Sequence, residues 1–200
     1  PGLNANVTKV REGNDEYISN ILKSRHGSVL EHVTMSFIFA DVSRVFTHEL
    51  VRHRAGVAIS QESLRYVRLT ELRGWIPPSL EGTKFKELFE STFSMLEGVQ
   101  QRLADAFQMD SLDFATKKAL TSAFRRIAPL GLATSIGWTT NIRTLRFVLE
   151  QRTSRHAEEE IRRVFARVFY IVFDRHPHLF QDANLEPVNG IPEITFVNQK

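Results

Sequence analysis

The chain is organised around Arg52-His53-Arg54-Ala55-Gly56-Val57-Ala58-Ile59-Ser60-Gln61-Glu62-Ser63-Leu64-Arg65, a polar stretch between two segments with apolar periodicity. It holds three arginines, a histidine, two serines, a glutamine and a glutamate. Arginine presents a planar fork of N–H donors that matches phosphates and other planar anions. We therefore interpret this stretch as the floor of an anion-binding site, with the flanking segments as its scaffold.

The composition is ordinary for a globular protein, with 42% apolar and 24% charged residues among 200. This length predicts a single domain over residues 1–200, and the start at Pro1 rather than Met suggests a truncated N-terminal part. The chain has no cysteine, which excludes disulfides, thiolate metal sites and a cysteine nucleophile. The cytoplasm is the default location.

Apolar periodicity predicts an α+β fold in which an antiparallel or mixed twisted sheet is flanked by long helices. The second of the expected helices would carry Arg52 to Arg54 on its last turn, and alternation in the second strand would put Ser63 and Arg65 on one face. Helices are expected over residues 14–24, 43–54, 83–107, 112–126, 141–151 and 155–173, and strands over 31–40, 62–69 and, at an edge, 194–196.

Asn141 can cap the helix that it opens, and Arg152 follows eleven residues later on roughly the same face. His156 joins that face if the helix continues, so the spacing indicates a lined pocket. A metal site is disfavoured around His26 and Glu31, because no His-Glu-x-x-His motif or third ligand is evident. A nucleic-acid partner is disfavoured because the net charge is only +3 and the arginines are dispersed.

The motifs resemble those of the flavin-dependent thymidylate synthases, a family with an Arg-His-Arg signature followed by Ser-x-Arg. Further matches follow in the family's order and span residues 26 to 160. They are Arg52-His53-Arg54 with Ser63-x-Arg65, His26-x-Ser28-x-x-Glu31-His32, Arg125 before Pro129, Thr140-Asn141-x-Arg143, and Leu149-x-x-Arg152-x-x-x-His156.

The resemblance implies a homotetramer with FAD at subunit interfaces. No membrane association is expected, because no apolar run approaches the roughly 20 residues of a membrane helix. The implied reaction is reductive methylation of uracil C5 in dUMP, with methylenetetrahydrofolate as one-carbon donor and NADPH as reductant. The implied catalytic residues are Arg52, His53, Ser63 and Arg152. The implied cofactor ligands are Arg52, His53, Arg54, Ser28, Asn141, Arg143 and His156. The implied nucleotide ligands are Gln61, Glu62, Ser63, Arg65, Arg125 and Arg152, and the implied folate-side residues are His26 and His53.

Two departures from the family pattern lie close to the implied nucleotide site. The spacer of residues 55–62 is one residue longer than expected, and Phe147 stands where an Asn is expected. They leave open a UMP or UMP/dUMP C5-methylase of a nucleoside-antibiotic pathway, and hydroxymethylation in place of methylation. A basic nucleic-acid-binding module is the alternative from another class.

The missing cysteine agrees with the resemblance on independent grounds. The other class of thymidylate synthase activates the uracil ring with a cysteine nucleophile, which this chain cannot supply. Hydride from a reduced flavin, in a pocket whose fixed positive charge polarises the uracil, fits the residues that are present.

Overall fold

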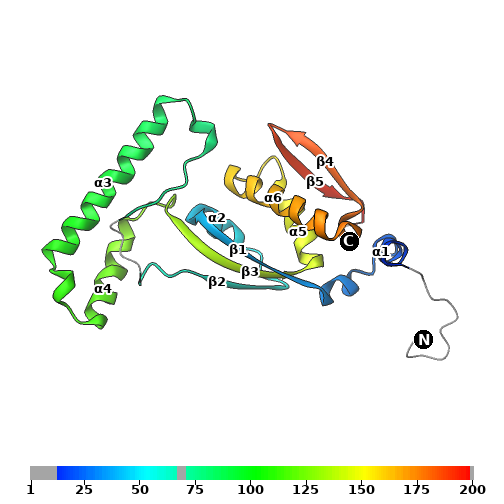
Figure 1. Cartoon of the computed structure of the whole chain (residues 1–200), viewed down its shortest axis with the longest axis horizontal. Coiled ribbons are helices and arrows are strands. Elements are labelled where there is room, and N and C mark those ends of the chain that lie inside the picture. The colour runs from blue at the N-terminus through cyan, green and yellow to red at the C-terminus, as the bar shows by residue number, and fades with distance from the viewer. Residues whose placement is uncertain (1–12, 67–70, 199–200) are drawn as a thin grey trace. The chain divides into compact units, whose positions relative to one another are not determined.

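The computed structural model describes residues 13–66 and 71–198, which form two compact units (Figure 1). Unit 1 combines residues 1–35, 53–57 and 139–200, and unit 2 combines residues 36–52 and 58–138. The chain therefore crosses between the units several times. The loop that contains His53 is part of unit 1, whereas Arg52 is part of unit 2.

Unit 1 is built on two helices, α5 (Ile142–Thr153) and α6 (Glu159–Arg175), and on the hairpin of β4 (Ala183–Val188) and β5 (Ile191–Phe196). The two strands pair antiparallel, with Ala183 opposite Phe196 and Val188 opposite Ile191. Helix α1 (Asn14–Lys23) and the 3-10 helices η1 (Gly27–His32) and η5 (Pro177–Phe180) complete the unit. Its buried side chains include Leu145, Leu149, Ile161, Phe165, Phe169, Phe180 and Ile194.

A buried ion pair ties α5 to the segment before β4. The Arg146 guanidinium donates to both carboxylate oxygens of Asp182, at 2.8 and 2.9 Å, and to the Leu179 carbonyl at 2.7 Å. The Arg146 side chain is 2% exposed and that of Asp182 is 10% exposed. The guanidinium carbon also lies 4.0 Å from the centre of the Phe196 ring. Every part of the pair is thus satisfied, as a buried charge requires.

The Asp182 pair predicts a loss of stability in acid. Burial tends to raise the pKa of Asp182, but hydrogen bonds and charge attraction from Arg146, with the Asn198 amide, bring the net shift below the ordinary value. A carboxyl with a lowered folded-state pKa stabilises the fold above its unfolded pKa of about 4 and loses that contribution as the pH falls through the folded pKa. Urea midpoints from pH 7 to 3 should fall mainly below about pH 4. The variant Asp182→Asn should show a flatter profile there, and an equally steep one would contradict the assignment.

Unit 2 contains most of a three-stranded sheet with the strand order β1-β3-β2. These strands are β1 (Thr34–Ser43), β3 (Ala133–Asn141) and β2 (Val57–Gln61). Every second residue of β3 is buried, including Trp138 at its centre, whose ring lies near those of Phe37 and Phe39. The central strand therefore anchors the sheet in the core of this unit.

Helices supply the rest of unit 2. The short helix α2 (Arg44–Leu50) is capped by the Ser43 hydroxyl, which accepts from the Phe46 amide at 3.1 Å. Helices α3 (Lys84–Ala106) and α4 (Phe114–Phe124) lie side by side in Figure 1, and Gln100 donates to the Phe124 carbonyl at 3.1 Å. Three 3-10 helices flank them: η2 (Pro78–Leu80) before α3, η3 (Met109–Ser111) between α3 and α4, and η4 (Arg125–Ile127) after α4. The Thr83 and Asp113 side chains cap α3 and α4.

The structure confirms the α+β class and most of the expected helices, with α6 starting at Glu159 rather than Arg155. Three expectations were wrong. Residues 27–32 form a 3-10 helix, so the first strand starts at Thr34, and α2 ends at Leu50 rather than Arg54. The second strand covers Val57–Gln61, and residues 62–66 turn away from it. The rest of that predicted strand, residues 67–69, lies outside the described residues.

Sequence periodicity did not predict β3 or β4, whereas the predicted edge strand at 194–196 is part of β5. Among the described residues, no helix is long and apolar enough to cross a membrane.

Candidate active site

A loop of residues 53–57 lies along helix α5, and this contact gathers several of the predicted site residues in unit 1. The Asn141 side chain caps α5 by accepting from the Thr144 amide at 2.8 Å, as the sequence predicts. The backbone N–H of Asn141 donates to the Gly56 carbonyl at 3.1 Å, and the Thr144 hydroxyl donates to the Ala55 carbonyl at 3.0 Å. The loop is thus attached to the first turn of the helix by two hydrogen bonds.

The same loop reaches the last turn of α5 through His53. Arg152 Nε donates to His53 Nε2 at 2.7 Å. Because Nε2 accepts this hydrogen bond, the proton of the neutral imidazole is assigned to Nδ1. The Phe147 ring lies edge-on to the imidazole, with 6.1 Å between ring centres. Because Phe147 is 47% exposed, it forms an apolar wall beside His53 where a polar side chain was expected.

Arg152 and His156 line one open surface cavity, although the continuous helix that would place them on one face does not exist. Helix α5 ends at Thr153, and His156 lies in the connection to α6. The lining also contains Glu193 of β5, which Arg155 binds at 2.5 Å. The hydrogen bonds from Arg155 lower the pKa of Glu193, so this carboxylate stays ionised. The cavity is lined by Glu150, Gln151, Arg152, Ser154, His156, Ala157, Glu193 and Thr195.

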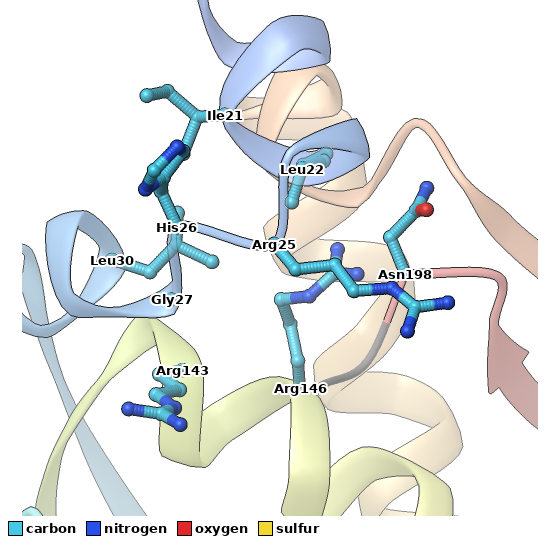
Figure 2. A pocket seen from close by; sticks show the side chains of 9 residues that line it. All are labelled: Ile21, Leu22, Arg25, His26, Gly27, Leu30, Arg143, Arg146 and Asn198. Carbon is cyan, nitrogen blue, oxygen red and sulfur yellow. The ribbon is translucent and has the colours of Figure 1, made fainter.

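A second pocket of unit 1 contains His26 and Arg143 (Figure 2). Figure 2 shows Arg143 and Arg146 rising from α5 opposite the segment that follows α1. Arg143 binds Glu31 at 2.5 Å, and a β-carbon on Gly27 would lie 3.0 Å from Arg143 Nε. The pocket is lined by Ile21, Leu22, Arg25, His26, Gly27, Leu30, Arg143, Arg146 and Asn198. Its polar surface therefore consists mainly of N–H donors.

The predicted nucleotide residues of unit 2 follow β2. Gln61 donates to the Thr47 hydroxyl of α2 at 3.1 Å. Ser63 and Arg65 do not share a strand face, because residues 63–66 form a turn in which the Tyr66 amide donates to the Ser63 carbonyl at 3.1 Å. The Ser63 hydroxyl accepts weakly from the Arg65 amide at 3.4 Å. The turn nevertheless keeps the two side chains within one short segment.

Four predicted residues make few contacts within the described part of the chain. No hydrogen bond or ion pair joins Arg52 or Arg54 to another described residue, and both side chains are exposed. They lie after the end of α2 rather than on its last turn, which corrects the sequence prediction. Ser28 and Glu62 are exposed as well, although the Glu62 carbonyl accepts from Arg44.

Arg125 begins the 3-10 helix η4 instead of closing α4. Its guanidinium lies close enough to that of Arg44 to lower the pKa of Arg44, together with the larger effect of burial. Arg44 and Thr47 were both missed by sequence reasoning, because a single Arg or Thr in a helical pattern carries no motif. Within the described ranges, no group of three or more His, Asp and Glu side chains could hold a metal ion.

Several curated proteins of one name are similar to this chain. A protein of Corynebacterium diphtheriae named flavin-dependent thymidylate synthase is 33% identical over 174 residues, covering 84% of this chain and 69% of that protein. Proteins of the same name from Mycobacterium sp. strain JLS and Clostridium tetani are 30% and 31% identical, covering 90% and 88% of this chain and 74% and 73% of their own lengths.

These matches place the chain among enzymes of the flavin-dependent thymidylate synthase type. It belongs to the thymidylate synthase complementing protein family, whose model matches residues 3–178. The match covers unit 2 and unit 1 up to residue 178, and with them every proposed site residue.

Proposed function

We propose that the protein catalyses FAD-dependent reductive methylation of uracil C5 in dUMP, with methylenetetrahydrofolate as one-carbon donor and NADPH as reductant. The attachment of the loop 53–57 to α5 carries this proposal. It brings His53, Asn141 and Arg152, which come from three motifs, together along α5. The relatives named flavin-dependent thymidylate synthase support the same reaction.

The N–H donors of unit 1 near the loop 53–57 and α5 suit a flavin dinucleotide. A pyrophosphate needs N–H donors and positive charge, and the side chains nearby supply both. We assign Arg52, His53, Arg54, Ser28, Asn141, Arg143 and His156 to FAD, and His26 with His53 to the folate. When bound and reduced by NADPH, FAD would supply the hydride for the reaction. The hydrogen bond from Arg152 would hold His53 in one tautomer and orientation beside that site.

The nucleotide would be held by Gln61, Glu62, Ser63, Arg65, Arg125 and Arg152. Since the chain lacks cysteine, fixed positive charge is the means by which these residues would polarise the uracil carbonyls. Arg52, His53, Ser63 and Arg152 are the proposed catalytic residues. Gln61 is held in place by Thr47 of α2, which would give the base-side contacts a rigid support.

The assembly belongs to the same proposal. We propose a homotetramer with FAD at subunit interfaces, a single functional domain over residues 1–200, and a cytoplasmic location. Size-exclusion chromatography with light scattering on the FAD-loaded protein tests the tetramer.

The activity is tested by tritium release from 5-tritiated dUMP and 5-tritiated UMP in parallel, with methylenetetrahydrofolate and NADPH. Purified protein should be yellow, retain FAD and release tritium from dUMP. Release from UMP at an equal or higher kcat/KM would reassign the substrate, and formation of 5-hydroxymethyl product would reassign the transferred group. Colourless protein without release, but with salt-dependent affinity for RNA or DNA, would favour the nucleic-acid-binding alternative.

The variant Arg152→Gln gives the assay a residue-level control. It removes a charged donor beside His53, and we expect kcat/KM to fall by about 100-fold, the usual effect of losing one positioned donor. Arg167→Gln removes the same charge from the exposed side of α6 and should leave activity unchanged. Equal losses in both variants would mean that overall charge, rather than the Arg152–His53 contact, matters.

A further inference from the structure

Strand β5 is attached to the C-terminal half of α5 by hydrogen bonds to side chains of the helix. The Ile194 N–H donates to the Thr153 hydroxyl at 2.9 Å, and the Phe196 N–H donates to Glu150 Oε1 at 2.8 Å. Backbone N–H groups two residues apart in a strand point to the same side, so both donors leave β5 on the side away from β4. The helix therefore satisfies the outer edge of the hairpin, and the hairpin in turn holds the end of α5.

The connection from α5 to α6 is held at its middle by Glu193 of the same strand. The Glu193 carboxylate accepts from the Arg155 backbone N–H at 2.9 Å, from Nε at 2.8 Å and from Nη2 at 2.5 Å. Both the main chain and the side chain of Arg155 are thus fixed. The connection spans only residues 154–158, and its last residue, Glu158, caps α6. One carboxylate therefore restrains a short segment whose ends are already held by helices.

His156 follows Arg155 directly and takes its position from this contact. Its own backbone N–H bonds only weakly to the Ser154 hydroxyl, at 3.4 Å. Within the described residues, the imidazole makes no hydrogen bond or ion pair, and it lines the cavity together with Arg152. The ring is therefore available to a ligand, while the backbone that carries it is held through Arg155.

The contact between Arg155 and Glu193 is better suited to positioning than to stabilising the fold. The Arg155 side chain is 44% exposed, so solvent screens its attraction to the carboxylate. An ion pair of this kind contributes little to the free energy of unfolding. Three hydrogen bonds to one carboxylate nevertheless define a single geometry for the connection, because the guanidinium and the backbone must both meet it.

We propose that Glu193 is a positioning residue for flavin binding, because it holds Arg155 and thereby places the imidazole of His156 against FAD. The inference rests on the proposed function, in which His156 is a ligand of FAD. It adds a residue that belongs to none of the motifs and lies beyond residue 178, where the match to the family model ends. The β4–β5 hairpin then supports the cofactor site as well as the core of unit 1.

The release of FAD from the loaded protein after dilution, followed by the recovery of flavin fluorescence, tests the proposal. Glu193→Gln keeps the size of the side chain but removes the charge that holds three N–H donors, so FAD should dissociate about tenfold faster. The urea midpoint should change little. Glu186→Gln is the matched control, because Glu186 meets the Arg155 guanidinium at 3.1 Å but not its backbone. That variant should release FAD within about twofold of the wild-type rate.

A double-mutant cycle shows whether Glu193 acts through His156. His156→Ala alone should also speed the release of FAD. Glu193→Gln should then add little in the His156→Ala background, because its effect requires the imidazole. Additive effects of the two variants, or a large fall in the urea midpoint of Glu193→Gln, would overturn the positioning role. If Glu193→Gln does not fold, Arg155→Gln removes the same guanidinium from the exposed partner and takes its place in the cycle.

The outcomes separate this inference from the proposed function. Wild-type protein that retains no FAD contradicts both. If the wild type retains FAD and only His156→Ala releases it faster, the role of Glu193 is overturned and the proposed function stands. If neither variant changes the release rate, the assignment of His156 to FAD is wrong as well.

Discussion

Asp182→Ala should lower the free energy of unfolding by about 3–5 kcal/mol, because it would leave the buried Arg146 guanidinium without its counter-ion. Arg146 cannot turn to solvent easily, since it is 2% exposed and its other contacts are the Leu179 carbonyl and the Phe196 ring. The loss is the penalty of an unpaired buried charge, and therefore exceeds the net stabilisation that the intact pair contributes.

Urea unfolding followed by circular dichroism measures this effect, with Glu81→Ala as control. Glu81 binds Lys86 at 3.0 Å in an ion pair whose side chains are 58% and 35% exposed, so solvent already screens it. A second test replaces both buried partners, as in Arg146→Met with Asp182→Leu, which should recover much of the lost stability. A midpoint for Asp182→Ala like that of Glu81→Ala would mean that water reaches Arg146.

Sequence periodicity missed β4, which has no fully buried residue, and β3, whose buried positions are only partly apolar. In β3 the buried face carries Thr134 and Thr140 beside Ile136 and Trp138, so a search for alternating apolar residues finds too few of them. The helices were easier to predict, because α3, α5 and α6 keep an apolar face over several turns and have capping side chains at their starts. β3 forms because its alternate side chains are buried against the rest of the unit, and the local sequence does not contain that information.

The end of α2 shows how tertiary contacts override a local pattern. The helical period runs on to Arg54, yet the chain leaves the helix at Leu50 so that residues 53–57 can lie along α5. The family resemblance gives the proposed site residues only as a set of motifs. It does not show that His53 meets Arg152, that Ser63 and Arg65 share a turn, or that Arg44 approaches Arg125. The contact of His53 with Arg152 joins residues from separate motifs, and Arg44 belongs to none of them.

Gly56→Ala should detach the loop 53–57 from α5 and abolish the placement of His53. Gly56 has a φ of +69°, which costs an alanine about 1–2 kcal/mol. The added β-carbon would also lie 2.4 Å from Asn141 Nδ2 and 2.6 Å from Thr144 Oγ1. Asn141 cannot move away freely, because its side chain caps α5, a contact that contributes about 1 kcal/mol. The two hydrogen bonds that attach the loop, at about 1 kcal/mol each, do not outweigh these costs.

The disturbance should stay within the loop, since the core of unit 1 is packed by α5, α6 and the β4–β5 hairpin. Hydrogen exchange of the Gly56 to Val57 segment should therefore speed up by about tenfold or more, as expected for a loss of 1.4 kcal/mol or more. FAD retention and tritium release should fall with it if the proposed function holds. Gly82→Ala is the matched control, because Gly82 has a φ of +71° but no atom within 4 Å of its added β-carbon. If Gly82→Ala speeds exchange around residue 82 as much as Gly56→Ala speeds it at Gly56 and Val57, backbone strain alone explains the effect. The close approach to Asn141 and Thr144 would then not control the loop.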